Sequence, residues 1–327
     1  MSARSTHPVT ALIALVVCTA GWTFAPVFIR LLRDDYEPLT QGFVRYAFGS
    51  AFLVTLCLVY HRPALFTLLR NPLPILGISL LNTFQQYTWT AGTYGATATT
   101  AQLIVKLSVV FVVIFAFILF QEERGVIRNP FYLFGTLLSM IGVAGVMVRD
   151  PQQLSEVFAP GNALLLITSV SWAIYAVWGK HLVLNLHPIP MFAVVSLITA
   201  IALGISALWF EQPTAALHAG ARATSVAALS GIIAIGGAHP AFHYAQKHFG
   251  SAFTSTFMLI LPLTTYAASL VLLPGEKLSL TQWAGAFVLL MGTLLIIVVE
   301  NRKRLSTSAA MRIAAEEAPS PAVERAL

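Results

Sequence analysis

Long apolar runs, each followed by a short polar stretch, make up most of this chain. An α-helix rises about 1.5 Å per residue, so about 20 apolar residues are enough to cross the roughly 30 Å hydrocarbon core of a bilayer. Turn residues and charges fill the connections, for example Arg33-Asp34-Asp35 and Arg149-Asp150-Pro151. The pattern predicts an all-α polytopic membrane protein with ten transmembrane helices, at residues 9–31, 38–60, 73–94, 97–120, 131–148, 161–180, 189–209, 224–246, 251–273 and 281–299.

The amino-acid composition agrees with lipid as the solvent for most of the chain. Hydrophobic residues make up 57% of the 327 positions and charged residues 10%, with a mean hydropathy of +0.79. Soluble globular domains carry about 25% charged residues. The run that starts at Val9 is longer than the core of about 7–15 residues in a signal peptide, so we interpret it as the first span, after a short cytoplasmic segment 1–8. Residues 302–327 are rich in Ala, Ser and Glu, and we expect a disordered cytoplasmic tail there.

The positive charges indicate orientation rather than nucleic-acid binding. The net charge is +6, but the basic residues stand singly between apolar runs. Ten spans place both termini on one side, and that side carries about twice as many Lys and Arg residues as the other. The positive-inside rule then places both termini in the cytoplasm, which makes this a protein of the cell inner (plasma) membrane with no nucleic-acid partner. The opposite orientation is the disfavoured alternative.

Residues in the first half of the chain match residues in the second half at a nearly constant sequence offset. Trp22 matches Trp172 at an offset of 150 residues, and Glu122 matches Glu276 at an offset of 154. The matches are collinear over five predicted helices, which indicates a first repeat at 9–155 and a second at 156–301. A unit of five helices is odd-numbered, so the second copy must enter the membrane from the opposite side. Inverted repeats recur in secondary transporters, which bind substrate between the repeats near the bilayer midplane.

On several of these segments the chain resembles the EamA-like branch of the drug/metabolite transporter (DMT) superfamily, over about residues 10–300. The resemblance implies a ten-helix carrier of metabolites such as amino acids. Two positions depart from the family pattern: Ser108 stands where members carry a proline matching Pro262, and Lys106 is not a general family feature. The segments that carry the resemblance are Gly21-Trp22, Pro38…Arg45, Gln121-Glu122-Glu123, Phe249-Gly250-Ser251-Ala252, Leu261-Pro262 and Pro274-Gly275-Glu276-Lys277.

Lys106 is the first candidate for a substrate-binding residue. It lies about 13 Å into the fourth predicted span by helix rise, too deep for its stem to reach the headgroups. Charged residues inside spans usually face a cavity or a partner. Two interpretations stay open: Lys106 attracts an anionic group of the substrate, or it is neutral or satisfied by carbonyls and neighbouring amides. Arg45 is shallower and is equally consistent with a binding site and with a structural clamp to a loop carboxylate.

Other polar and aromatic residues share helix faces, because positions three and four apart lie on one side of a helix. Lipid cannot hydrogen-bond amides or imidazoles, so these faces must look inward, either to a substrate cavity or to polar contacts between helices. The aromatic residues could stack on a substrate or pack in the core. The candidate substrate-binding residues beside Lys106 are Gln102, Asn82, Gln85, Gln86, Trp89, Trp22, Trp172, Tyr175, His239, His243 and Tyr244.

The titratable residues limit the coupling chemistry. No Asp or Glu lies inside any predicted span, so the carboxylate relay common in proton pumps is absent. His239 and His243 are the candidates for proton coupling, while uniport or exchange needs neither. Their i, i+4 spacing also matches a metal pair, but no third ligand is in view, so we expect no metal and no cofactor.

Together these features predict a secondary transporter, expected to export a small carboxylated or zwitterionic metabolite such as an amino acid by alternating access. The alternative is a multidrug exporter of lipophilic cations, which an electropositive interior disfavours. A remote alternative is an intramembrane enzyme, but the spans lack a nucleophile or metal set, so we expect no enzymatic activity. The expected partners are the solute and the lipid bilayer, and a monomer and a homodimer both stay open.

Overall fold

The computed structural model describes residues 8–119, 129–147 and 159–317. Within these ranges the chain folds into α-helices with short 3-10 and π segments. The first half forms α1 (Pro8–Leu31), α2 (Pro38–Tyr60), α3 (Arg62–Arg70), α4 (Leu73–Tyr94), α5 (Ala98–Val105), α6 (Ser108–Leu119) and α8 (Pro130–Met147). The second half forms α9 (Pro160–Val183), α10 (Pro188–Phe210), η3 (Pro213–His218), α11 (Ala221–Ser230), η4 (Gly231–Gly237), α12 (Ala238–Phe249), α13 (Ser251–Phe257), η5 (Met258–Ile260), α14 (Leu261–Leu272) and α15 (Leu280–Glu317).

Six helical stretches of the described chain are long and apolar enough to cross a membrane, and the bent pair α3–α4 adds a seventh. Three more helices are apolar but shorter, at Pro130–Val146, Met258–Leu272 and Leu280–Ile296. The expectation of an all-helical polytopic membrane protein is therefore confirmed, while the number of ten crossings stays a prediction.

Prolines start several of the helices. Pro38, Pro63, Pro130, Pro160 and Pro188 each stand at the first or second position of a helix. Proline is well suited there, because its missing N–H would have no partner in the first turn and its fixed φ fits the helix. The loops between the apolar runs therefore end where the sequence places proline.

The structure differs from the predicted spans in three places. Residues 62–70, expected in a loop, form α3, which meets α4 at 86° across Asn71-Pro72. The fourth predicted span is broken between α5 and α6 at Lys106. Disorder was expected over 302–327, but α15 continues as a helix to Glu317, and the rest of the predicted tail, 318–327, lies outside the described residues.

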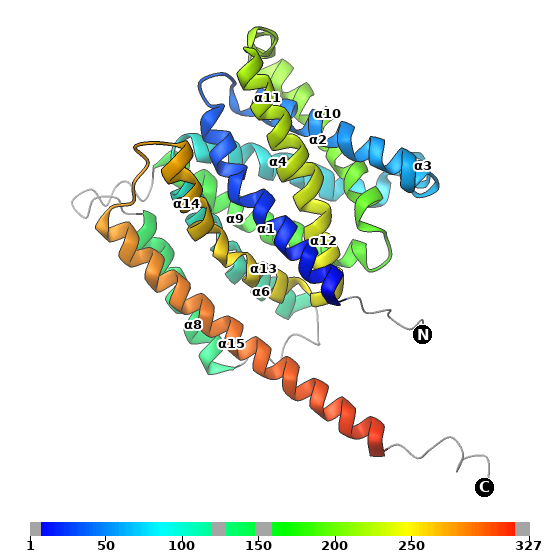
Figure 1. The fold of residues 1–327 in the computed structure, drawn as a ribbon, viewed down its shortest axis with the longest axis vertical. Coiled ribbons are helices and arrows are strands. Elements are labelled where there is room, and N and C mark those ends of the chain that lie inside the picture. The colour runs from blue at the N-terminus through cyan, green and yellow to red at the C-terminus, as the bar shows by residue number, and fades with distance from the viewer. Residues whose placement is uncertain (1–7, 120–128, 148–158, 318–327) are drawn as a thin grey trace.

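The helices pair across the two halves. α8 packs on α15 at one edge of the molecule, α2 packs on α10, α4 on α9, and α1 on α12 (Figure 1). Glycines let α8 and α15 approach closely: a Cβ on Gly135 would stand 2.6 Å from the carbonyl of Gly292, and one on Gly142 would stand 2.8 Å from that of Gly285. Because the lower number of one helix meets the higher number of the other, these two helices run antiparallel.

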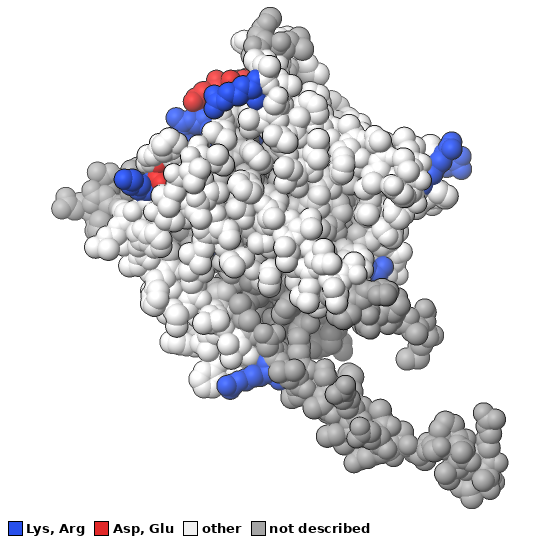
Figure 2. Space-filling view, in the orientation of Figure 1, with Lys and Arg blue, Asp and Glu red and all other residues white. Residues whose placement is uncertain are grey.

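Charged side chains lie at the margins of the face shown in Figure 2. Lys, Arg, Asp and Glu gather at separate edges and leave a broad uncharged belt between them. The apolar side chains exposed along the helices, such as Phe131 in α8 and Leu208 in α10, agree with a surface that faces lipid.

Candidate functional site

A small chamber lies inside the bundle, where helices of both halves meet. Its wall includes Trp22 of α1 and Lys106 from the first half, and Trp172 of α9 and His239 of α12 from the second. The chamber has a volume of about 70 Å³. Ligand pockets usually measure roughly 300–1,000 Å³, so the chamber is smaller than a usual ligand pocket.

Lys106 enters the chamber wall from the break between α5 and α6. Around it the backbone switches to i→i−3 hydrogen bonds: the N–H of Lys106 donates to Leu103 O at 3.1 Å, and that of Val109 donates to Lys106 O at 3.0 Å. The side chain is only 8% exposed and makes no hydrogen bond or ion pair with a described residue. The interpretation that carbonyls and amides satisfy this lysine therefore finds no support in the described contacts.

Arg45 of α2 lines the same chamber and is 2% exposed. Its Nε donates to Ser230 Oγ at 2.7 Å, and its Nη1 is buried without a partner. The loop carboxylate that a structural clamp would need is not found among the described residues, whose two ion pairs involve other arginines. Burying an unpaired charge costs several kcal/mol, about 3–5 kcal/mol when a buried pair is broken, so a counter-charge in the chamber would stabilise this wall.

Three glutamine amides line the chamber beside the cations. Gln86 Nε2 donates to Gln85 Oε1 at 2.7 Å, which links the two α4 amides. Gln102 Nε2 of α5 donates to the carbonyl of Trp22 at 3.0 Å. That carbonyl lies four residues before Pro26, which has no N–H to donate to it. Gln102 therefore has a structural role in addition to its place on the chamber wall.

Two equivalent tryptophans meet at the interface of the halves. The rings of Trp22 and Trp172 contact each other edge-to-face, with centroids 5.1 Å apart. Trp22 Nε1 also donates to Ala234 O at 3.0 Å, in the π-helical segment η4. A third indole, that of Trp89 in α4, completes the aromatic part of the chamber wall. The chamber wall thus combines indole rings with amides and charged side chains.

Of the two predicted histidines, only His239 borders the chamber. Its ring stacks on Phe192 at 4.5 Å with a tilt of 6°, and its Nδ1 is buried without a partner. His243 instead contacts the hydroxyl of Tyr175 at 2.8 Å through Nε2 and Gln246 Oε1 at 3.0 Å through Nδ1. In the described chain no three His, Cys, Asp or Glu residues come close enough to hold a metal ion.

Four predicted residues lie outside the chamber wall. Asn82 Nδ2 donates to Tyr46 Oη and to Thr199 Oγ1, both at 3.0 Å, and so joins α4 to α2 and α10. Tyr175 and His243 bond to each other. Tyr244 packs on His248, with centroids 4.5 Å apart. The contacts of Asn82, Tyr175 and His243 join different helices, which was the alternative to a substrate cavity, whereas Tyr244 and His248 both lie in α12.

Some wall residues were missed from the sequence. The sequence did not decide whether Arg45 belongs to a binding site or to a structural clamp, and Ser108 and Ser255 were not named as binding residues. All three line the chamber. The available signal was polarity at membrane depth, which is rare and points inward. Met258 and Leu261 also line the chamber, but an apolar residue in an apolar run carries no such signal.

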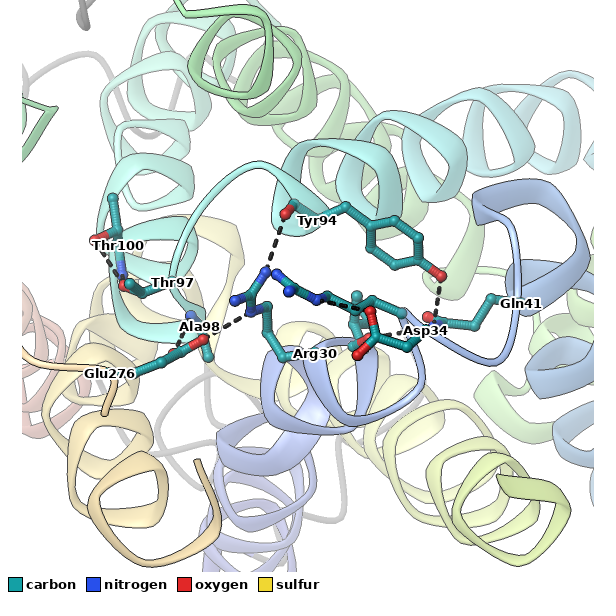
Figure 3. A network of polar contacts seen from close by, with 10 residues as sticks. Arg30, Asp34, Gln41, Tyr94, Thr97, Ala98, Thr100 and Glu276 are labelled. Atoms are coloured by element: carbon teal, nitrogen blue, oxygen red, sulfur yellow. Dashed lines mark hydrogen bonds and ion pairs between the residues drawn. The ribbon is translucent and has the colours of Figure 1, made fainter. Parts of the chain in front are cut away.

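At the C-terminal end of α1, a polar network joins the two halves (Figure 3). Arg30 Nε binds Glu276 Oε1 at 2.7 Å, and its Nη1 donates to Tyr94 O at 3.0 Å. Glu276 Oε2 accepts the N–H of Ala98 at 2.8 Å. The ion pair therefore fixes the end of α1, the end of α4 and the start of α5 to the loop before α15.

The model of the EamA-like transporter family matches this chain twice, at residues 9–148 and 159–298. The chain belongs to the EamA-like transporter family. Similar curated proteins carry the name "uncharacterized transporter": one from Archaeoglobus fulgidus is 23% identical over 298 residues, 89% of this chain and 99% of that protein. Another, from Haemophilus influenzae, is 23% identical and covers 84% of this chain and 93% of its own length.

A solved crystal structure has the same fold. It superimposes with a TM-score of 0.67 at 16% sequence identity and covers 88% of this EamA-like chain and 98% of its own. At this identity the likeness concerns the fold alone. The family match identifies the protein as a membrane transporter.

Proposed function

We propose that this EamA-like protein is a secondary transporter that exports a small carboxylated or zwitterionic metabolite across the cell inner membrane by alternating access. It would do so as ten spans in two inverted five-helix repeats, with both termini in the cytoplasm. Lys106 and Arg45 would attract the negative group of the solute, and the indole rings would hold its carbon skeleton.

One observation carries the proposal: the chamber between the halves is lined by two buried cations that have no described acidic partner. Charged side chains inside a membrane protein are costly and mark solute or ion pathways. A negatively charged solute would supply the missing partner.

The inverted arrangement is supported by the pairing of helices. Each half places its first helix against the third span of the other: α1 packs on α12, and α9 packs on α4. The fifth spans, α8 and α15, meet each other antiparallel through equivalent glycines. A two-fold axis in the membrane plane relates helices in this way.

Alternating access is supported by breaks in equivalent helices. The fourth span is interrupted at Lys106, and at an offset of 154 the ninth is interrupted by η5, Met258–Ile260. Breaks of this kind line transporter sites and let half-helices move. Since the chamber is too small for a metabolite as it stands, movement at these breaks would widen it.

A ligand screen on purified protein tests the proposal. Folded protein should be stabilised by its solute according to RT ln(1+[L]/Kd), so amino acids and organic acids are screened by thermal shift. Hits are then tested for counterflow in proteoliposomes. Lys106→Gln should abolish most of the shift, while Lys277→Gln, an exposed loop lysine, should leave it unchanged. Absence of flux for every member of a broad metabolite panel, with folded protein, would contradict the proposal.

The indole-rich wall also favours one alternative, a multidrug exporter of lipophilic cations, since aromatic faces bind cations. The two chamber cations oppose it by charge repulsion. Ethidium efflux from cells separates the two functions: efflux that persists in Lys106→Ala would support the alternative, and no efflux in either protein would support an anionic or zwitterionic solute.

A further inference from the structure

The chamber carries two positive charges and, in the described chain, nothing negative to balance them. The described ion pairs are Arg30–Glu276 and Arg33–Asp34, neither of which includes a chamber residue. Aromatic faces do not replace the missing anions, because the described cation–π contact is that of Arg62 over Phe66. Both chamber cations are therefore left for a ligand.

The two cations are held differently. Arg45 is fixed, since its Nε is bonded to Ser230 Oγ and the side chain is fully enclosed. Lys106 makes no bond to a described residue, and its ammonium stands on a flexible stem. The Lys106 ammonium can bind an anionic group over a range of positions, whereas the Arg45 guanidinium can bind one only at a fixed position. This difference makes Lys106 the general anion contact and Arg45 the selective one.

Three unpaired polar atoms mark the same chamber. Arg45 Nη1, His239 Nδ1 and Ser255 Oγ are all buried without a partner, and they come from α2, α12 and α13. Buried polar atoms nearly always have hydrogen-bond partners. An acid group with several oxygens offers acceptors for polar atoms that three different helices contribute to the chamber wall.

We propose that the chamber takes an organic dianion, a dicarboxylate or a phosphate monoester, with one negative charge held by Lys106 and the other by Arg45. The proposal rests on the transport function proposed above and assigns a doubly charged substrate to it, either a dicarboxylate within the class named there or a phosphate monoester beside it. A monoanion would leave one buried cation without a partner. A zwitterion would add an ammonium group that meets no carboxylate on the described wall. The three indoles would enclose the carbon skeleton between the two charges.

Matched pairs of ligands test the proposal on the purified full-length protein. Each pair differs by one negative charge: succinate and succinamate, phthalate and phthalamate, phenyl phosphate and methyl phenyl phosphate. Phenylalanine is the zwitterionic comparison. Because hydrogen bonds to charged groups are strong, the dianion of at least one pair should bind about tenfold more tightly, or better, than its monoanion. The pair with the largest ratio distinguishes a carboxylate from a phosphate substrate.

Variants assign the two charges. Arg45→Gln should remove the preference and weaken the dianion about tenfold, with the monoanion affected by less than about twofold. Lys106→Gln should weaken both members of the pair. Lys277→Gln, outside the chamber, should change neither. If Arg45→Gln does not fold, the wild-type ratios decide the matter by themselves, and Arg45→Lys reports whether a charge without the fork of the guanidinium is enough.

The outcomes also separate this proposal from the transport function. Counterflow of a monoanion or zwitterion that is as fast as that of the dianion, or equal weakening of both by Arg45→Gln, would overturn the dianion assignment and leave transport intact. Absence of binding and counterflow for the whole panel would overturn both. Selective counterflow of a dianion supports both.

Discussion

The two halves of the chain share a fold, and their contributions to the chamber differ in charge. Arg45 and Lys106 come from the first half, while the equivalent positions of the second half, at offsets of 150 and 154, are Val195 and Ile260. The second half supplies Trp172, an unpaired imidazole and a hydroxyl instead. A duplicated backbone thus encloses the chamber from both sides, but it does not require that both copies carry the binding chemistry.

The same contrast appears at the ends of α2 and α10. At the start of α2, Glu211 accepts the N–H groups of Leu39 and Thr40, both at 2.7 Å, which suits the positive end of a helix. The equivalent contact at the start of α10 pairs His61 with His187, whose rings lie 4.3 Å apart. At one end of the molecule the contacts between the halves are therefore made by the carboxylates of Glu211 and Glu276. At the other end they include a contact between two imidazole rings.

The largest expected effect concerns the end that is tied by carboxylates. Glu276→Gln leaves the mostly buried guanidinium of Arg30 without its negative partner, so the free energy of unfolding should fall by about 2–3 kcal/mol. Unfolding in detergent, followed by tryptophan fluorescence, measures the change. Asp34→Asn is the matched control, because the Arg33–Asp34 pair is exposed and should contribute less than about 1 kcal/mol. Equal effects of the two variants would show that the Arg30–Glu276 contact does not hold the halves together.

The two halves contribute equivalent glycines to the contact between α8 and α15, so substitutions in either helix should lower the free energy of unfolding by similar amounts. Gly142→Ala in α8 would place a Cβ against the backbone of α15. Gly285→Ala in α15 would place a Cβ against the backbone of α8, 2.7 Å from Gly142 O. Overpacking of this kind costs about 1–3 kcal/mol, and we expect similar losses for both. Gly220→Ala is the control, since nothing lies within 4 Å of its Cβ position. A large loss for one variant and none for the other would contradict the symmetry of this helix pair.

The sequence predicted an all-helical membrane protein correctly, because each apolar run is long and bounded by proline or charge, while the number of ten spans stays a prediction. It missed the break at Lys106, where the backbone switches to i→i−3 hydrogen bonds, since no proline or glycine stands there to indicate it. It also missed α3, whose nine residues are too short and too mixed in polarity to show as a span. These features are set by tertiary contacts, which local pattern does not encode.

The candidate site was predicted in part for the same reason. Helical spacing placed Asn82 and Gln86 on one face of the third span, and both point inward as expected. Only Gln86 reaches the chamber, because Tyr46 and Thr199 stand opposite Asn82 and bond to it. The sequence predicts which residues share the polar face of a helix, but it does not predict which residues of the neighbouring helices lie opposite that face.

A smaller difference should separate the two equivalent tryptophans. Trp22→Phe loses the hydrogen bond from Nε1 to Ala234 O, whereas the described contacts of Trp172 are ring contacts, which phenylalanine partly keeps. A buried hydrogen bond contributes about 1 kcal/mol, so Trp22→Phe should lower the free energy of unfolding by about that much more than Trp172→Phe. Equal losses would mean that ring packing alone accounts for both residues.

The smallest effect is expected at the histidine pair. Partial burial, and then the charges of His61 and Lys247, hold the pKa of His187 below its ordinary value of 6.5. Above pH 6.5 the ring is neutral in both the folded and the unfolded chain and contributes nothing. As the pH falls below 6.5, the unfolded chain binds a proton that the folded chain still refuses, so stability decreases until the lowered pKa is passed.

His187→Gln should therefore flatten the pH dependence of the unfolding midpoint between about pH 7 and pH 5, and added salt should flatten it in the wild type. His61→Gln and Lys247→Gln should each flatten it in part, because each removes one of the charges that disfavour protonation of His187. The change stays small, since His187 is only partly buried and stays accessible to solvent. The equivalent acidic position supplies the comparison: Glu37→Gln should leave the slope in this range unchanged, because it removes neither the imidazole of His187 nor a charge that acts on it. A slope that survives His187→Gln would locate the pH-sensitive contact elsewhere and remove the contrast between the two ends.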